Sequence, residues 1–175
     1  MKIYHYGLNY DEDRCRIELA LYEALSESDA AYSPEWLYAF LLNRIHLERT
    51  WLDQDILVPL NRNGCVSSLY FVQNGAQTYG LFSLRLTLLY ALLSFREAFV
   101  FVHYKADDIR SPTKQDNDVY RSLKESFGSL SLRLCDFLLI GTNGWYSSRM
   151  HGGNDPNCQD DAATTITSKN SDRAA

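Results

Sequence analysis

The sequence predicts an α/β fold, a three-layer α-β-α sandwich built on a mixed sheet. The apolar segments "EAFVFVHY" and "LRLCDFLLIG" are typical of strands buried on both faces. Longer segments with apolar residues at helical spacing lie before and between them. With 175 residues, of which 46% are hydrophobic, the chain is long enough to bury one substantial core and short for two domains.

The N-terminal region is expected to be helical. In "EDRCRIELALYEALSES", Ile17, Leu21, Ala24 and Leu25 fall on one face at helical spacing. Residues 1–32 are therefore expected to form an N-terminal helical extension.

The next helix and the hairpin after it are marked by their boundary residues. "SPEWLYAFLLNRIHLERTW" begins with Ser33 as N-cap and Pro34 at the first helical position, where a missing N–H costs nothing. "DILVPLNRNGCVSSLYFV" places two short apolar runs around Asn63 and Gly64, a pair that tolerates the positive φ of a hairpin turn. Pro59 cannot donate to a ladder, which favours an edge position or a bulge.

The second half of the chain alternates helices and strands. "LRLTLLYALLSF" is typical of a mostly buried helix, and "EAFVFVHY" of a core strand that carries His103 to its carboxyl end, where sites tend to lie in open α/β sheets. Val119, Leu123 and Phe127 then form one helical stripe in a helix beginning near Thr113. "LRLCDFLLIG" predicts another buried strand, and "GWYSS" a last short one.

Composition and charge indicate which segment lacks a core, whether a nucleic acid is an expected partner and which compartment to expect. Residues 149–175 are polar and poor in apolar residues, so we expect a disordered tail. The net charge is −5, with no basic stripe of the kind that neutralises phosphates, so charge does not indicate nucleic-acid binding. The N-terminus lacks the apolar core of a signal peptide, and no apolar run is long enough to span a bilayer. The four cysteines are far apart with no C-x-x-C pair, so a reducing, cytoplasmic setting is expected, with no membrane association.

The segment "FVFVHYKADDIRSPTKQD", followed by "LCDFLLIG", resembles the RadC-type branch of the JAB/MPN (JAMM) metalloprotease family. That branch typically has an apolar strand, then H-N-H-P-S-G-D-P-T-P-S-x-x-D, then a helix and L-D-H-I-I-I-G. The spacing agrees without a gap from His103 to Asp116, and Gly75 falls where the family has a glycine. The resemblance covers residues 33–148 and implies a JAB/MPN-like, cytidine-deaminase-like architecture.

The resemblance also implies a metal site, in which two histidines and an aspartate hold zinc. By position, His103 matches the first histidine and Asp116 the aspartate, whereas Lys105 stands at the second histidine. An ammonium has no lone pair and cannot ligate zinc, so the motif is degenerate and no cofactor is expected. Zinc is expected only if the site is active. The Lys105 ammonium is expected instead to lie between the carboxylates of Asp116 and Asp53.

The catalytic positions of the family carry over in part. Asp53 falls at the glutamate that acts as general base, with Asp55 as a near neighbour, and Thr113 falls at the serine that stabilises the oxyanion. A plainer alternative is that Thr113 and Asp116 form a capping box at the start of a helix. His103 could likewise be a hydrogen-bonded core histidine.

Because the departures cluster at the metal, the sequence favours a non-catalytic RadC-like JAB/MPN domain that acts as a protein-binding or regulatory module. Protein partners are therefore expected, and a homo-oligomer is compatible with this reading. One alternative is an active zinc-dependent metallohydrolase of the JAMM type, a peptidase or isopeptidase. The other is an accessory factor of DNA repair or of a mobile element, which would bind nucleic acid.

Overall fold

A computed structural model describes residues 2–11, 16–27, 31–49, 53–72, 83–109 and 111–151, with side chains only between residues 31 and 150. The elements in chain order are β1 (Lys2–Asp11), β2 (Arg16–Glu27), α1 (Pro34–Ile45), the 3-10 helix η1 (Leu47–Arg49), β3 (Gln54–Leu60), β4 (Ser68–Phe71), α2 (Leu84–Leu93), β5 (Ala98–Tyr104), α3 (Lys114–Ser129), β6 (Arg133–Gly141), β7 (Gly144–Ser147) and α4 (Ser148–His151).

The strands form one mixed sheet in the order β2-β1-β4-β3-β5-β6-β7. β1 runs parallel to β4 and β5 runs parallel to β6, while every other neighbouring pair is antiparallel. β3 and β5 lie at the centre of the part that contains the predicted site. The predicted mixed sheet is confirmed.

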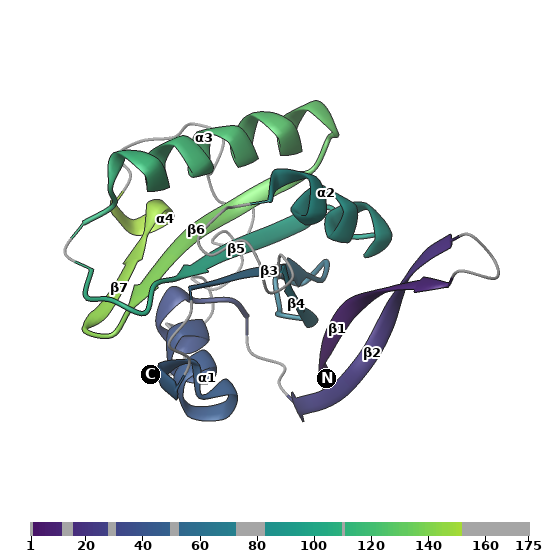
Figure 1. The fold of residues 1–175 in the computed structure, drawn as a ribbon, viewed down its shortest axis with the longest axis horizontal. Coiled ribbons are helices and arrows are strands. Elements are labelled where there is room, and N and C mark those ends of the chain that lie inside the picture. The colour runs from purple at the N-terminus through teal and green to yellow at the C-terminus, as the bar shows by residue number, and fades with distance from the viewer. Residues whose placement is uncertain are drawn as a thin grey trace, which may run out of the picture.

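Helices cover both faces of this sheet, which makes three layers (Figure 1). Side chains alternate along each strand, so successive residues enter opposite layers. In β5, Val100 and Val102 join the core under α1, whereas Phe99 and Phe101 join the core under α2 and α3. The predicted three-layer sandwich is therefore confirmed, and the sheet itself separates two hydrophobic cores.

Most local predictions from residue 33 onward are confirmed. Ser33 caps α1 by accepting a hydrogen bond from the backbone N–H of Trp36, and the hairpin turn places Gly64 at φ +73°. α2, β5, α3, β6 and β7 occupy the segments predicted for them. Among the described helices, none is both long and apolar enough to cross a membrane.

Pro59 illustrates how the sheet accommodates a missing donor. β3 lies between β4 and β5, so the predicted edge position is wrong. The bulge is confirmed, because three residue steps on β3, from Leu57 to Leu60, face four steps on the other strand, from Val66 to Tyr70. Within this irregularity the Pro59 carbonyl accepts hydrogen bonds from both the backbone N–H and the hydroxyl of one serine, Ser67.

The N-terminal helix prediction is wrong. Residues 16–27 form β2, antiparallel to β1, and the flanking residues 12–15 and 28–30 lie outside the described part of the chain. Ile17, Leu19 and Leu21 also fit a two-residue repeat, so the pattern was compatible with a strand as well as with a helix. Pairing with β1 decides between them, because tertiary contacts override weak local propensity.

The C-terminal boundary also differs from prediction. Residues 149–151 were expected in a disordered tail but complete α4. The reason is the buried carboxylate of Asp136 in β6, which accepts hydrogen bonds from the backbone N–H of Arg149 at 3.0 Å and from the Ser148 hydroxyl at 3.0 Å. The rest of the predicted tail, residues 152–175, lies outside the described residues.

The same carboxylate links three separate parts of the fold. Its other oxygen accepts hydrogen bonds of 2.6 Å from Tyr32, just before α1, and of 2.6 Å from Ser147 at the end of β7. Burial, together with the nearby charge of Asp136, raises the pKa of Tyr32. With four donors the Asp136 carboxylate is fully satisfied, which a buried charge requires.

Asp136→Ala is expected to lower the free energy of unfolding by about 3 kcal/mol, because it strands buried donors and leaves a cavity. Tyr32→Phe removes only one donor and is expected to cost about 1 kcal/mol. Urea unfolding of both variants measures these losses. Equal losses of unfolding free energy for the two substitutions would contradict the view that the Asp136 carboxylate holds these separate donors together.

Candidate functional site

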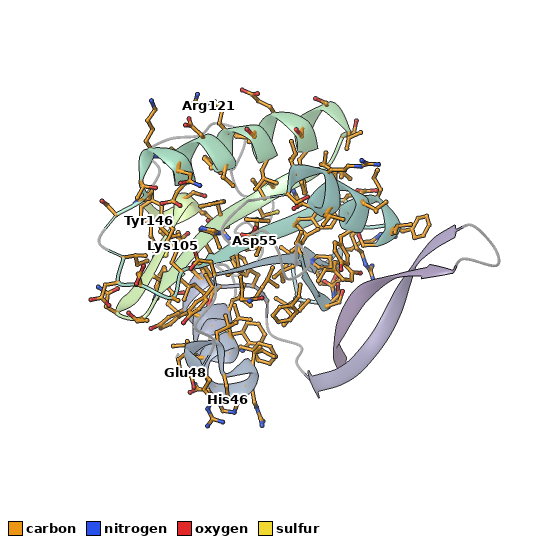
Figure 2. The ribbon with its side chains drawn as sticks, in the orientation of Figure 1. His46, Glu48, Asp55, Lys105, Arg121 and Tyr146 are labelled. Carbon is orange, nitrogen blue, oxygen red and sulfur yellow. The ribbon has the colours of Figure 1, made fainter. Side chains whose placement is uncertain are left out.

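The candidate site lies where β3 and β5 meet the start of α3. Asp55 on β3 is directly opposite His103 on β5 in the antiparallel register. Along their strands, Asp55 and His103 alternate with residues that belong to the hydrophobic core under α1. Both side chains therefore lie on the opposite face of the sheet, toward α2 and α3. Figure 2 shows Asp55 and Lys105 below α3 in that view, well away from His46 and Glu48 at the end of α1.

His103 is held in one orientation by Asp55. Its Nδ1 lies 2.6 Å from Oδ1 of Asp55, and both side chains are largely buried. An ionised carboxylate only accepts hydrogen bonds, so the proton lies on Nδ1. The other ring nitrogen, Nε2, is 3.8 Å from Oδ1 of Asp116, which is too far for a hydrogen bond.

Asp116 is the most heavily bonded residue of the site. Its buried carboxylate accepts hydrogen bonds of 2.7 Å from the backbone N–H of Thr113 and of 2.7 Å from the Thr113 hydroxyl. The Thr113 hydroxyl in turn accepts from the backbone N–H of Asp116, which completes the predicted capping box. Thr113 and Asp116 therefore form the N-terminal cap of α3.

Lys105 forms an ion pair with the carboxylate of Asp116. Its Nζ lies 2.8 Å from Oδ2 and 2.8 Å from Oδ1 of Asp116. Burial alone would raise the pKa of Asp116, but the hydrogen bonds from Lys105 and Thr113 outweigh burial and hold that pKa below its usual value. The carboxylate is thus kept ionised by groups of the chain itself.

The backbone around Lys105 is fixed by the end of β6. The backbone N–H of Lys105 donates to the carbonyl of Ile140, and that of Ile109 to the side-chain oxygen of Asn143. Gly141 permits this approach, since a Cβ there would lie 2.7 Å from the backbone carbonyl oxygen of Asp107. The ammonium is therefore presented to Asp116 from an anchored loop.

The structure brings four of the discussed residues together and leaves one aside. Asp55, His103, Lys105 and Asp116 form a connected cluster, with Thr113 at its edge. Asp53, which the motif spacing placed at the general base, is exposed and accepts a hydrogen bond from the backbone N–H of Ala106. The structure thus places Asp55, not Asp53, against His103. Of the two expected carboxylates, the Lys105 ammonium pairs with Asp116 alone, so its expected position between Asp116 and Asp53 is wrong.

Asp55 could have been placed beside His103 from strand alternation. Asp55 precedes the apolar run of β3 and His103 follows that of β5, and alternation puts both on the face that carries Leu57, Phe99 and Phe101. Asp136 is an acid inside an apolar strand, a sign of a buried carboxylate that requires donors. The hydroxyls that follow it in "GWYSS" supply two of those donors.

A family model for the RadC-like JAB domain matches residues 31–153, more than half of the chain. The chain belongs to the RadC-like JAB domain family. The match takes in α1 and the strands from β3 to β7, and leaves out β1 and β2. No curated protein matches the chain.

Within the described residues of this JAB domain, no three His, Cys, Asp or Glu side chains are grouped as a metal-ligand set. His103, Lys105 and Asp116, which the resemblance matches to the metal ligands of the family, do lie together, but Lys105 contacts the carboxylate of Asp116 directly through its ammonium. The cluster as it stands is therefore an ion pair supported by hydrogen bonds.

The lowered pKa of Asp116 predicts a stability that depends on pH. Because the folded state disfavours protonation of this carboxyl, its contribution is complete above about pH 4 and is lost as the pH falls through the folded-state pKa. The difference in unfolding free energy between the wild type and Asp116→Asn is expected to shrink as the solution is acidified. Urea unfolding over a pH series measures it, and a difference that stays constant would contradict this origin.

Removing the ammonium is expected to destabilise the fold. Lys105→Ala leaves a buried carboxylate without its cation, and since Lys105 is partly exposed the expected cost is about 2 kcal/mol. Lys114→Ala, at the exposed first position of α3, the helix that carries Asp116, is the matched control and should change stability by less than about 0.5 kcal/mol. Identical melting curves for Lys105→Ala and the wild type would refute a structural role for the ion pair.

Proposed function

We propose that this chain is a non-catalytic JAB domain that acts as a protein-binding or regulatory module. The observation that carries the proposal is the contact of Lys105 Nζ with both carboxylate oxygens of Asp116. A zinc ion at this site would need those oxygens as well as a lone pair from residue 105, which an ammonium does not have.

Electrostatics points in the same direction. A dication held by His103 and Asp116 would lie within a few ångströms of the ammonium, a repulsion on the order of several kcal/mol even at an effective dielectric of about 20. Two protein ligands are also fewer than the three of a catalytic zinc site. The lowered pKa of Asp116 adds support, since the paired carboxylate is ionised without a metal.

A role in binding follows from what the domain retains. The site residues are integrated in the fold as an ion pair and a helix cap, so the architecture is kept without the metal. A rigid α/β scaffold whose surface loops are free to vary is well suited to hold a protein partner. The acidic net charge of −5 favours such a partner over a nucleic acid.

The decisive experiment is the zinc content per chain of the wild type, Lys105→His and Lys105→Met, each purified without chelator. The wild type and Lys105→Met are expected to hold little zinc. Lys105→His is expected to hold at least about ten times more, because Asp55 already orients the His103 ring as an outer-shell carboxylate does in metal sites. A zinc-dependent rise in melting temperature confined to Lys105→His gives a second readout.

The opposite outcome is equally clear. If the wild type carries close to one zinc per chain, the non-catalytic proposal is wrong, and the chain should be assayed as a zinc-dependent peptidase or isopeptidase. If neither the wild type nor Lys105→His binds zinc, the site differs from a family metal site by more than one ligand, and the proposal that Lys105 alone replaces the metal is wrong.

A further inference from the structure

The first two strands are an addition to the JAB domain. The family match begins at residue 31, whereas β1 and β2 lie before it. In the described residues, β1 joins the JAB sheet by parallel pairing with β4, from Tyr4 to Tyr6. Beyond this pairing the two strands continue as a two-stranded segment, residues 6–11 and 16–21, that extends past the end of α2 (Figure 1). We call this segment the β1–β2 ribbon.

The register gives the β1–β2 ribbon one apolar face. Tyr6 lies opposite Tyr70, which belongs to the hydrophobic core under α2 and α3, so both positions are on that face of the sheet. Between Tyr6 and Asp11 the pairing has no shift, so every second pair lies on the same face. The pairs on it are Tyr6 with Leu21, Leu8 with Leu19, and Tyr10 with Ile17. The pairs on the opposite face are Gly7 with Ala20, Asn9 with Glu18, and Asp11 with Arg16.

A ribbon with one apolar face requires a second layer. Two strands alone are marginally stable in water, and an apolar sheet face is normally buried by a helix or by another sheet. α2 and α3 provide that layer over the JAB sheet, and α2 lies next to β2. Beyond the end of α2, none of the described helices continues the layer along the ribbon (Figure 1). A further helix placed beside α2 would complete it.

Charge indicates which kind of helix fits. Residues 1–30 contain seven acidic and three basic residues, a net charge of −4, and the whole chain has −5. The negative charge is therefore concentrated before the family match. Electrostatic attraction extends about 10 Å at 0.1 M salt, so acids on either face of the ribbon attract cations near it. The same charge would repel a second copy of the ribbon, an anionic lipid surface or a nucleic acid.

We propose that the β1–β2 ribbon binds a basic amphipathic helix of a partner protein, which lies on the apolar face of the ribbon beside α2. This inference rests on the binding role proposed above and names its surface and its class of partner. Apolar residues of the partner helix cover the face that carries Leu8 and Leu19, as in other complexes in which a helix binds by its apolar side. Lysines or arginines at the flanks of the helix balance acids of β2 such as Glu18 and Glu23.

The proposal is tested with a peptide of leucine and lysine that forms an amphipathic helix of about five turns, titrated with the full chain and followed by fluorescence anisotropy. A scrambled peptide of the same composition tests non-specific charge attraction, and a helix of leucine and glutamate tests the sign of the charge. The wild type is expected to bind the leucine-lysine helix at least about tenfold more tightly than either control peptide. Equal binding of the leucine-lysine helix and either control would overturn the proposal.

Substitutions in the ribbon locate the binding surface. Leu8→Thr/Leu19→Thr replaces two apolar residues of the face by another good strand former and is expected to weaken binding at least about tenfold. Ala20→Thr places the same residue on the opposite face and is the matched control, which should leave the affinity unchanged. Glu18→Gln/Glu23→Gln is expected to weaken binding several-fold at low salt and to reduce its salt dependence. If Leu8→Thr/Leu19→Thr binds as tightly as Ala20→Thr, the apolar face is not the surface and the proposal is wrong.

Two further measurements separate loss of the surface from loss of the fold. Leu19→Ile keeps an apolar residue at the same position and is expected to bind like the wild type, which a failure caused by misfolding alone does not explain. Sedimentation velocity tests a second copy as the occupant, and a wild-type dimer that Leu8→Thr/Leu19→Thr dissociates would overturn the partner helix. Zinc content tests the non-catalytic proposal through Lys105, which lies outside the ribbon, so the two proposals can fail separately.

Discussion

A buried carboxylate must be surrounded by donors, and this JAB domain depends on that constraint at two places. Asp116 takes its donors from the segment after β5 and from the start of α3. Asp136 takes its donors from before α1, from β7 and from α4. Apolar packing between the layers is non-directional, so these hydrogen bonds decide where α3 and α4 begin. In the described residues no buried side-chain nitrogen or oxygen lacks a partner.

The parts of the fold that could be predicted are those whose signals are local. A serine followed by proline, an Asn-Gly turn and uninterrupted apolar strands each define an element without reference to distant residues. β1 and β2 could not be predicted in this way. Ile17, Leu19 and Leu21 satisfy one repeat and Ile17, Leu21 and Leu25 the other, so only the presence of a paired strand distinguishes them.

The candidate site shows the same division. The spacing of His103, Lys105 and Asp116 reflects one strand end and one helix start, and this was enough to predict that these residues lie together and that a capping box begins α3. Which acid lies beside His103 could not be decided in the same way. The count along the chain runs back from Gly75 across the turn between β3 and β4, and any difference in turn length from the family changes which acid it reaches. The register between β3 and β5 decides in favour of Asp55.

The pairing of Lys105 with Asp116 also affects how the domain responds to its surroundings. A metal ion exchanges with solvent, so the charge at a metal site rises and falls with the supply of metal. An ammonium on an anchored loop is part of the polypeptide and is delivered once, at synthesis. The positive charge that balances Asp116 is therefore supplied by the polypeptide itself, whatever the supply of metal.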